Sequence, residues 1–319
     1  MRVLITGASG FVAPHLATLL HANGYEVHGL TRSSTPPGYH QIHYANLLSA
    51  PAVRSVLEAA RPDAIIHLAA QSAVPQSWQD PAGTLTNNIA GQANLLETVH
   101  QLNLPARIIV AISAEVYGNV PPAHLPVQEE EVFRPLNPYA VSKAAQDLLA
   151  FQYATALGMD IIRLRTFNHL GPGQSDRFAI PSFARQIAEI ELGRREPVLY
   201  TGDLSTERDY TDVRDIAHAY LRAIEATTSG AVYNVGSGIA YRIADLLEQL
   251  CTLARTPITV RPDPHRFRPA DIPRIVSDSS RFRNETGWEP RITIAQSLAD
   301  ILEDWRHRVR IEYPPALLS

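Results

Sequence analysis

VLITGASGFVA, residues 3–13, joins a short apolar run to a glycine-rich turn. Gly7 permits a tight turn from a strand into a helix, and Gly10 leaves room for a phosphate to approach the backbone. Ala13 is small enough to keep that helix packed against the strand. The start of the helix would present free N–H groups and the positive end of its dipole. This segment therefore predicts a strand–turn–helix unit that binds the diphosphate of a dinucleotide.

Short apolar runs alternate with longer helical patterns through the first half of the chain. Strands are expected at 2–5, 26–30, 41–44, 64–68, 107–112 and 160–165. Helices are expected at 11–23, 52–61, 84–101 and 139–157. This alternation predicts an α/β fold with a doubly wound parallel sheet, covered by helices on both faces in the Rossmann manner.

The second half has denser Gly and Pro loops, with a strand expected at 231–234 and helices at 244–253 and 294–306. We expect a dinucleotide-binding domain over residues 1–167, with returning segments near 209–236 and 272–280. Residues 168–319 would form mainly a smaller, discontinuous α/β substrate-binding lobe. A chain of 319 residues is long enough for this, because single cores stop growing at about 250–300 residues.

Composition excludes several classes of partner. With 45% hydrophobic and 19% charged residues the chain has the composition of a globular enzyme. A net charge of −4 without a long basic run argues against nucleic acid and anionic membrane surfaces. Cys251 is the only cysteine, so no intrachain disulfide can form. No run reaches the roughly 18 apolar residues of a membrane span, so we expect a cytoplasmic protein. No metal site is expected.

Tyr139 and Lys143 lie four residues apart, which places a phenol and an ammonium on one face of a helix. Hydride transfer at a carbinol carbon requires a proton to move at its oxygen. The ordinary tyrosine pKa of about 10 would be lowered by the lysine and by the positive nicotinamide ring. Lys143 can also bond the cofactor ribose. Ser113, at the end of a strand, would hold the same substrate oxygen at the carboxyl edge of the sheet.

Glu115 follows Ser113 by two residues, so it would face the same side if the strand continues. Its carboxylate would then act as a base or as a hydrogen-bond acceptor in the site.

The choice of dinucleotide depends on the charge that follows the second strand. An acid there would bond a ribose hydroxyl and repel a 2′-phosphate. Residues 29–34 read GLTRSS and contain no acid, while Arg32 supplies a guanidinium. This favours NADP, with NAD as the alternative.

Four segments resemble the extended short-chain dehydrogenase/reductases that modify nucleotide sugars, the NAD-dependent epimerase/dehydratase family. They are TGASGF (6–11), HLAAQS (67–72), SAEVYG (113–118) and PYAVSK (138–143). Three further segments, NHLGPGQ (168–174), RDYTDV (208–213) and RPADIP (268–273), look most like its GDP-4-dehydro-6-deoxy-D-mannose reductases. The resemblance covers nearly the whole chain.

The resemblance implies roles for particular residues. The catalytic set would be Ser113, Tyr139 and Lys143, with Glu115 as a candidate beside them. The cofactor would contact Gly7, Gly10, Phe11, Val12, Arg32, Leu68, Ala69 and Ala70, together with Tyr139 and Lys143. The substrate would contact Ser72, Ser113, Asn168, Arg208 and Arg268, the last three at its diphosphate, where forked guanidinium groups suit phosphate oxygens.

Three positions depart from the family pattern. Ala13 replaces the last glycine of the cofactor turn, and Asp271 replaces a glutamate after Arg268. Asn46 stands where the family often has aspartate, which alters an expected contact to adenine.

The resemblance leaves three related enzyme activities open. The 4,6-dehydratases typically carry Thr-(Ser or Asp)-Glu where this chain reads Ser113-Ala114-Glu115. Their Arg-Lys pair is also missing from residues 178–183, FAIPSF, and their RDWGHA is RDYTDV here. These differences favour a reductase, although Glu115 keeps a GDP-mannose 4,6-dehydratase open. Ser-Ala before Val-Tyr-Gly also occurs in nucleotide-sugar 4-epimerases.

The leading hypothesis is an enzyme that reduces the 4-keto group of GDP-4-dehydro-6-deoxy-D-mannose to GDP-D-rhamnose with NAD(P)H. A non-catalytic NAD(P)-sensing module is a hypothesis of another class, disfavoured because Ser113, Tyr139 and Lys143 are all present. The nucleobase rests on resemblance alone. A homodimer through helices 84–101 and 139–157 is expected, since these helices often pair in relatives.

Overall fold

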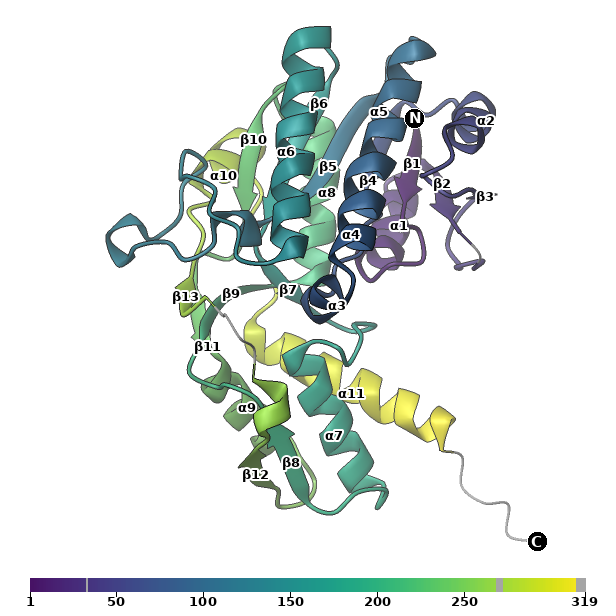
Figure 1. The fold of residues 1–319 in the computed structure, drawn as a ribbon. Helices are drawn as coiled ribbons and strands as arrows, with labels where there is room; N and C mark the ends of the chain where they lie inside the picture. Colours follow the sequence, from purple (N-terminus) through teal and green to yellow (C-terminus); the bar gives the residue numbers. More distant parts are fainter. Residues whose placement is uncertain (33, 268–271, 314–319) are drawn as a thin grey trace, which may run out of the picture.

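The computed structural model describes residues 1–32, 34–267 and 272–313. Its main body is a parallel sheet of seven strands in the order β10-β6-β5-β4-β1-β2-β3 (Figure 1). The strands are β1 (Arg2–Thr6), β2 (Glu26–Thr31), β3 (Gln41–Tyr44), β4 (Ala64–His67), β5 (Arg107–Ser113), β6 (Ile161–Thr166) and β10 (Val232–Val235). Every expected strand is present within one residue at either end. The predicted doubly wound α/β sheet is thus confirmed.

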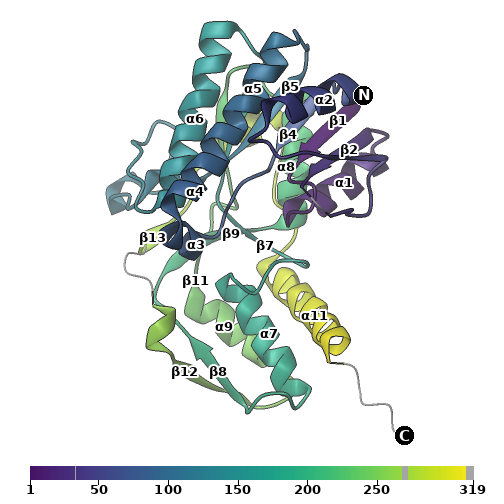
Figure 2. The same cartoon turned by 45° about the vertical axis from the view of Figure 1, so that its right-hand side comes forward.

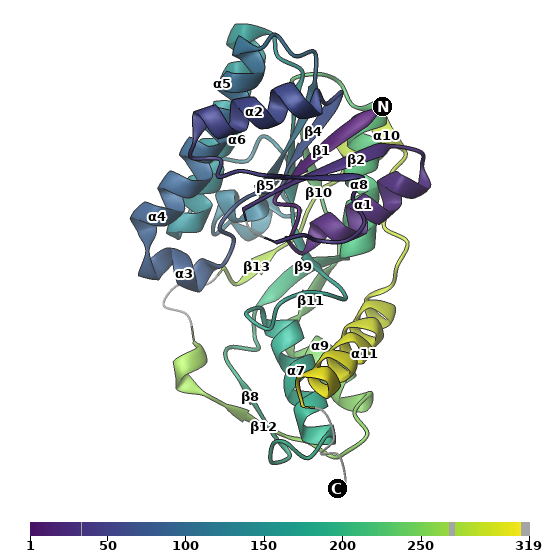
Figure 3. The same cartoon turned by 90° about the vertical axis from the view of Figure 1, so that its right-hand side faces the viewer.

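Helices cover both faces of this sheet (Figures 1 and 3). One face packs against α1 (Val12–Ala22), α8 (Val213–Ala226) and α10 (Ser280–Thr286). The other face packs against α2 (Ala50–Ala60), α5 (Gly91–Gln101) and α6 (Pro138–Leu157). Because both faces are covered, the strands are continuous apolar runs, such as Val3, Leu4 and Ile5, all fully buried.

The helix expected at 84–101 contains an internal irregularity. After α3 (Val74–Gln79), α4 (Pro81–Leu85) runs through a π-helical turn, η1 (Thr86–Ala90), into α5. The π-turn carries the buried Asn88, whose amide accepts from Gln71 N at 2.8 Å and donates to Ser142 Oγ at 2.8 Å. Its side chain therefore ties α6 to the loop that follows β4.

A smaller lobe lies beyond the carboxyl ends of the parallel strands (Figure 2). Its sheet consists of β11 (Ala240–Arg242), β9 (Glu207–Asp212) and β13 (Arg274–Ile275), with β7 (Asn168–Leu170) beside β9. A separate pair is formed by β8 (Val198–Thr201) and β12 (Thr259–Pro262), followed by a short 3-10 turn, η4 (Pro264–Arg266). Three helices share one core with Phe183, Leu246 and Trp305: α7 (Ala179–Glu191), α9 (Ile243–Thr252) and α11 (Ile294–Glu312).

The chain crosses between the two parts more than once. The expected boundary at residue 167 falls in the loop between β6 and β7, and β9 lies in the lobe. The chain then returns through α8 and β10 to the main sheet. None of the helices within the described ranges has both the length and the apolar character required to cross a membrane.

Candidate active site

The turn after β1 is built so that only glycine fits at its first position. Gly7 has φ +73°, and a Cβ there would lie 2.9 Å from the N and Cα atoms of Ala69. The turn thus packs directly on the segment Leu68–Ala70 that follows β4. Gly10 N donates to Gly7 O at 2.8 Å and closes the turn. Phe11 makes no side-chain cap to α1, which leaves the first N–H groups of the helix available to an anion.

A pocket of about 460 Å³ opens over this turn. Its walls come from the turn and α1, and from the loop after β7: Ser9, Gly10, Phe11, Pro14, His15, Pro172, Gly173 and Ser175. The space lies between the two parts of the molecule, and the glycines give its floor an exposed backbone. Such a cradle suits the diphosphate of a dinucleotide, which needs N–H donors at close range.

The residues 171–175, here named the 171–175 loop, are held from two sides. His15 Nε2 lies 2.9 Å from the carbonyl oxygen of Pro172 and must donate to it, because a carbonyl only accepts. Gly173 N donates to Asp304 Oδ2 of α11 at 2.9 Å. Phe11 stacks on His169, with ring centroids 5.9 Å apart and planes 5° from parallel. The loop is therefore attached to α1 of the main body and to α11 of the lobe at once, next to the Phe11–His169 contact.

Arg32 is exposed in the bend that follows β2. No acid follows that strand before Glu58, so a 2′-phosphate would meet no repelling carboxylate from this bend. Asn46 Oδ1 accepts from Leu48 N at 3.0 Å and thus closes its own local turn. Ser72 is exposed in the loop between β4 and α3.

The reacting groups meet where β5 ends and α6 begins. Ser113 is the last residue of β5, and its side chain interacts with Tyr139 in the first turn of α6. Lys143, one turn further on, is buried and donates from Nζ to Ala111 O at 2.8 Å. The structure therefore brings the serine, the phenol and the amine together at the carboxyl edge of the sheet.

Asn137 and Pro138 explain why α6 starts at this point. Asn137 is the N-cap, and its Oδ1 accepts from Ala140 N at 2.8 Å. Pro138 takes the first helical position, where its missing N–H costs nothing. This cap fixes the turn that carries Tyr139.

The electrostatics of the pair differ from the expectation. Burial raises the pKa of Tyr139 to about 12; the Ser113 side chain opposes this and the charge of Glu115 adds to it. Burial also lowers the pKa of Lys143 to about 7. The expectation that the lysine depresses the phenol was wrong for the protein's own groups, because burial acts more strongly. Tyr139 is thus held as a phenol, the form that can donate a proton.

Glu115 does not continue the strand. The strand ends at Ser113, whose Oγ accepts from Glu115 N at 3.2 Å and caps a 3-10 turn, η2 (Ala114–Tyr117). The condition for Glu115 to face the same side as Ser113, that the strand continues, is therefore not met. Its carboxylate nevertheless returns to the site, because Asn137 Nδ2 donates to Glu115 Oε2 at 3.0 Å.

His67 is a site residue that the sequence reasoning missed. It ends β4, and its Nδ1 lies 2.8 Å from Thr6 Oγ1. Its Nε2 is buried without a partner among the described residues. Burial, with Lys143 adding to it, lowers the pKa of His67 to about 3, so the ring is neutral. HLAAQS contained it, but nothing in the spacing showed that it would lie beside Lys143.

The expected diphosphate contacts lie in the lobe. Asn168 on β7 pairs with Tyr210 of β9, two residues from Arg208. Arg208 is buried, and its Nη1 donates to Glu207 O at 2.9 Å. Arg268 lies outside the described residues. In the parts of the chain that the structure describes, no group of three or more His, Cys, Asp or Glu side chains could hold a metal ion.

Comparisons with known proteins place this site in context. The sequence profile described as GDP-mannose 4,6 dehydratase matches residues 4–301. The GDP-6-deoxy-D-mannose reductase of Pseudomonas aeruginosa is 40% identical over 311 residues, which is 98% of this chain and 99% of the relative.

Two solved structures share the fold over nearly all of both chains. RMD from Pseudomonas aeruginosa complexed with NADPH superimposes with a TM-score of 0.87 at 39% identity, covering 96% of this chain and 99% of the other. The UDP-glucose 4-epimerase of Thermus thermophilus in complex with NAD gives 0.85 at 29% identity, covering 96% and 99%.

Proposed function

We propose that this chain, which belongs to the GDP-mannose 4,6 dehydratase family, reduces the 4-keto group of GDP-4-dehydro-6-deoxy-D-mannose with NADPH to form GDP-D-rhamnose. The observation that carries the proposal is the placement of Ser113 beside Tyr139, with Lys143 one turn away, in a chain 40% identical to a reductase over almost its full length. This is an NAD(P)-dependent nucleotide-sugar oxidoreductase of the short-chain dehydrogenase/reductase type.

The protein's own groups suit a dinucleotide. Gly7 and Gly10 clear the backbone for the diphosphate, and Phe11 and Val12 begin the helix whose N–H groups face it. Arg32 stands where a 2′-phosphate would need a cation, which supports NADP, with NAD as the alternative. Leu68, Ala69 and Ala70 would line the opposite wall. When bound, the cofactor would supply the hydride.

Tyr139 would give its proton to the ketone oxygen as the carbonyl becomes an alcohol. Its raised pKa keeps it protonated at neutral pH, which is the form reduction requires. Ser113 would hold the same oxygen and polarise it. Lys143, anchored on Ala111 O, lies on the same helix face and would bond the cofactor ribose. Asn168, Arg208, Arg268 and Ser72 are proposed to hold the sugar nucleotide.

The surroundings of Glu115 favour reduction over dehydration. A 4,6-dehydratase also needs a group that removes a proton at C5. Glu115 is the one candidate the sequence offers, yet its carboxylate is engaged with Asn137, and the residue before it is the apolar Ala114. The dehydratase therefore remains the second candidate, carried by Glu115 alone.

The proposal is tested with Tyr139→Phe. Loss of the acid should lower keto-sugar-dependent NADPH oxidation by about 10²–10⁴-fold, while NADPH binding measured by fluorescence stays intact. Tyr153→Phe is the matched control, because that phenol lies on the same helix but donates to Glu97 at 2.9 Å. Retained turnover in Tyr139→Phe would remove Tyr139 as the acid.

Product analysis separates the related activities. NMR of a reaction with GDP-mannose alone should show no change, whereas the 4-keto derivative with NADPH should give the 6-deoxy alcohol. A 4-keto product formed from GDP-mannose without an added reductant would establish the dehydratase instead. A product inverted at C4 without net redox change would establish the epimerase.

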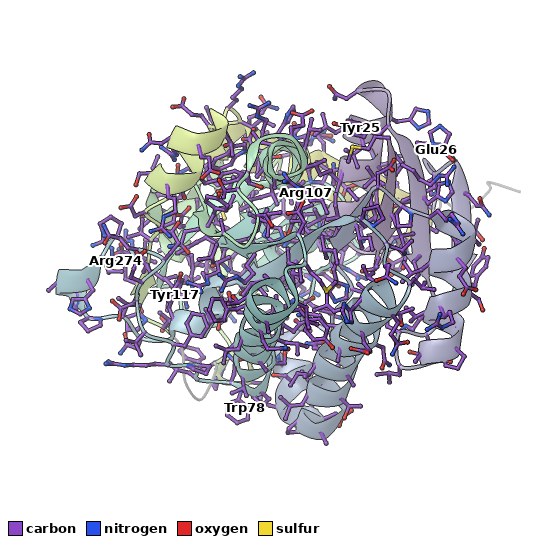
Figure 4. The ribbon with its side chains drawn as sticks, turned by 90° about the horizontal axis from the view of Figure 1, so that it is seen from above. Tyr25, Glu26, Trp78, Arg107, Tyr117 and Arg274 are labelled. Carbon is purple, nitrogen blue, oxygen red and sulfur yellow. The ribbon has the colours of Figure 1, made fainter. Side chains whose placement is uncertain are left out.

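A cytoplasmic homodimer is the proposed state of the protein. Along α6, Val141, Leu148 and Phe151 are 43%, 60% and 48% exposed. Trp78 of α3, 51% exposed, projects outward at the edge of the molecule in Figure 4. Apolar side chains clustered on one helix support pairing with a second copy. Sedimentation velocity would measure the mass.

A further inference from the structure

A ring of interactions, most of them hydrogen bonds, joins the end of β5 to the first turn of α6. Ser113 Oγ accepts from Glu115 N at 3.2 Å, and the same side chain interacts with Tyr139 and lowers its pKa. Glu115 Oε2 accepts from Asn137 Nδ2 at 3.0 Å. Asn137 Oδ1 then accepts from the N–H of Ala140, the residue next to Tyr139, at 2.8 Å. Each member of the ring therefore fixes its neighbours.

Within this ring Glu115 supplies the one ionisable side chain besides Tyr139 itself. Hydrogen bonds to a charged partner are shorter and roughly twice as strong as neutral ones. The Asn137 amide has its oxygen committed to the helix cap, so its NH₂ group can turn only toward Glu115. The carboxylate thus fixes which way Asn137 faces, and with it the oxygen that starts the helix.

We propose that Glu115 is a positioning residue: its carboxylate holds Asn137 in the orientation that caps α6 and so fixes Tyr139 for proton transfer to the substrate ketone. This role rests on the proposed reductase function, since it concerns the proton that Tyr139 gives. It also gives Glu115 a use that requires no dehydratase chemistry.

The neighbours of Tyr139 leave Glu115 as the carboxylate that acts on it. Lys143 on α6 has its pKa lowered by burial to about 7, and His67 on β4, on which Lys143 acts, is neutral. Burial raises the pKa of Tyr220 on α8, and Tyr139 adds to this. The charge of Glu115 is among the causes that raise the pKa of Tyr139. Glu115 thus both places the phenol and helps keep it protonated.

The first test uses the cofactor-free protein. Hydrogen exchange of the Ala140 amide, followed by NMR, reports directly on the cap. In Glu115→Ala this amide should exchange at least about fivefold faster, because the cap can open more often. Glu115→Gln keeps an oxygen for the Asn137 amide and should stay near the wild type. Unchanged Ala140 exchange in Glu115→Ala would overturn the proposal.

The second test uses turnover with the keto-sugar. Glu115→Ala should lower kcat about tenfold with little change in KM, whereas Glu115→Gln should lower kcat less. Asn137→Ser is the matched variant, since serine can cap a helix but cannot reach Glu115; it should lower kcat while keeping the carboxylate. A Glu115→Gln variant as inactive as Tyr139→Phe would show that the carboxyl group exchanges a proton with substrate, and would overturn the positioning role.

The third test separates charge from placement. In the reverse reaction, alcohol oxidation needs Tyr139 as phenolate, so the acid limb of kcat/KM follows the pKa of that tyrosine. Removing the charge in Glu115→Gln should move this limb to lower pH, whereas Asn137→Ser should leave it in place. An unmoved limb in Glu115→Gln would contradict the proposal. A wild type without any turnover would refute the reductase assignment, while the exchange measurement would still decide the link to Asn137.

Discussion

Asp147→Asn tests how strongly the helix that carries Tyr139 is locked to the sheet. Asp147 lies one turn beyond Lys143 on α6 and is 1% exposed. Its carboxylate accepts from Arg163 Nη1 at 2.9 Å and from Arg165 Nε and Nη2 at 2.8 and 3.2 Å. Arg165 Nη1 also donates to the Tyr117 hydroxyl at 2.9 Å. The cluster joins α6, β6 and η2, and Tyr117 is labelled in Figure 4.

Replacing the carboxylate by an amide removes one negative charge from between two buried guanidinium groups and turns an NH₂ group toward one of them. Breaking a buried charge pair on one side costs about 3–5 kcal/mol. For a chain of 319 residues each kcal/mol lowers the melting temperature by about 1.5 °C, so the variant should melt about 5–7 °C lower. Circular dichroism at 222 nm, followed against temperature and urea, would measure it.

Asp245→Asn is the matched control. Asp245 pairs with Arg242 at 2.5 Å, but both side chains are about half exposed. Exposed pairs contribute little, so this variant should melt close to the wild type. Added salt should leave the Asp147→Asn deficit unchanged, because a buried pair is screened much less than one in solvent. If the melting temperature of Asp147→Asn lies within about 1 °C of the wild-type value, as expected for an exposed pair, the reasoning is refuted.

Two further outcomes follow from the site. Gly7→Ala should weaken NADPH binding about tenfold or more, because a Cβ at φ +73° would meet the Ala69 backbone at 2.9 Å. Gly24→Ala is the control: its φ is +78° with nothing within 4 Å, so it has the backbone strain without the clash and should bind NADPH normally. Equal affinities of the two variants in fluorescence titrations would disprove the packing argument. Lys143 has a folded-state pKa of about 7, below its ordinary value of 10.5, so the unfolded chain binds more protons between these pH values and stability should rise with pH across that window. In the cofactor-free protein the melting temperature of the wild type should therefore rise relative to Lys143→Met from pH 7 to about 9.5, and parallel curves would contradict it.

The strands of the main sheet could be predicted because strands buried on both faces have a simple sequence pattern. β1 and β5 are unbroken apolar runs, and each is followed by a small or polar residue where the sheet ends. The glycine turn could also be predicted from the sequence, since the backbone geometry of the turn requires glycine at position 7. The four-residue spacing of Tyr139 and Lys143 placed both on one helix face without any tertiary information.

Features that depend on distant contacts could not be read in the same way. The amphipathic α8 was not anticipated, and neither were the short strands of the lobe, whose pairing joins segments far apart in the chain. Asp147 and its two arginines come from α6 and β6, and no sequence spacing indicates that the fold buries them together. Glu115 turns away from the strand because Ser113 Oγ caps η2. Such a side-chain bond competes with the hydrogen bonds that would extend the strand, and residue spacing does not reveal which of the two forms. The roles of the site residues stay predictions.

The double attachment of the 171–175 loop has a bearing on engineering. Exchanging this loop between relatives would replace both attachments together. A grafted loop must still offer a carbonyl to His15 and an N–H to Asp304, or α1 and α11 each lose a hydrogen-bond partner. A chimaera library should therefore randomise positions 15 and 304 together with the graft, since one short loop couples a helix of the main body to a helix of the lobe.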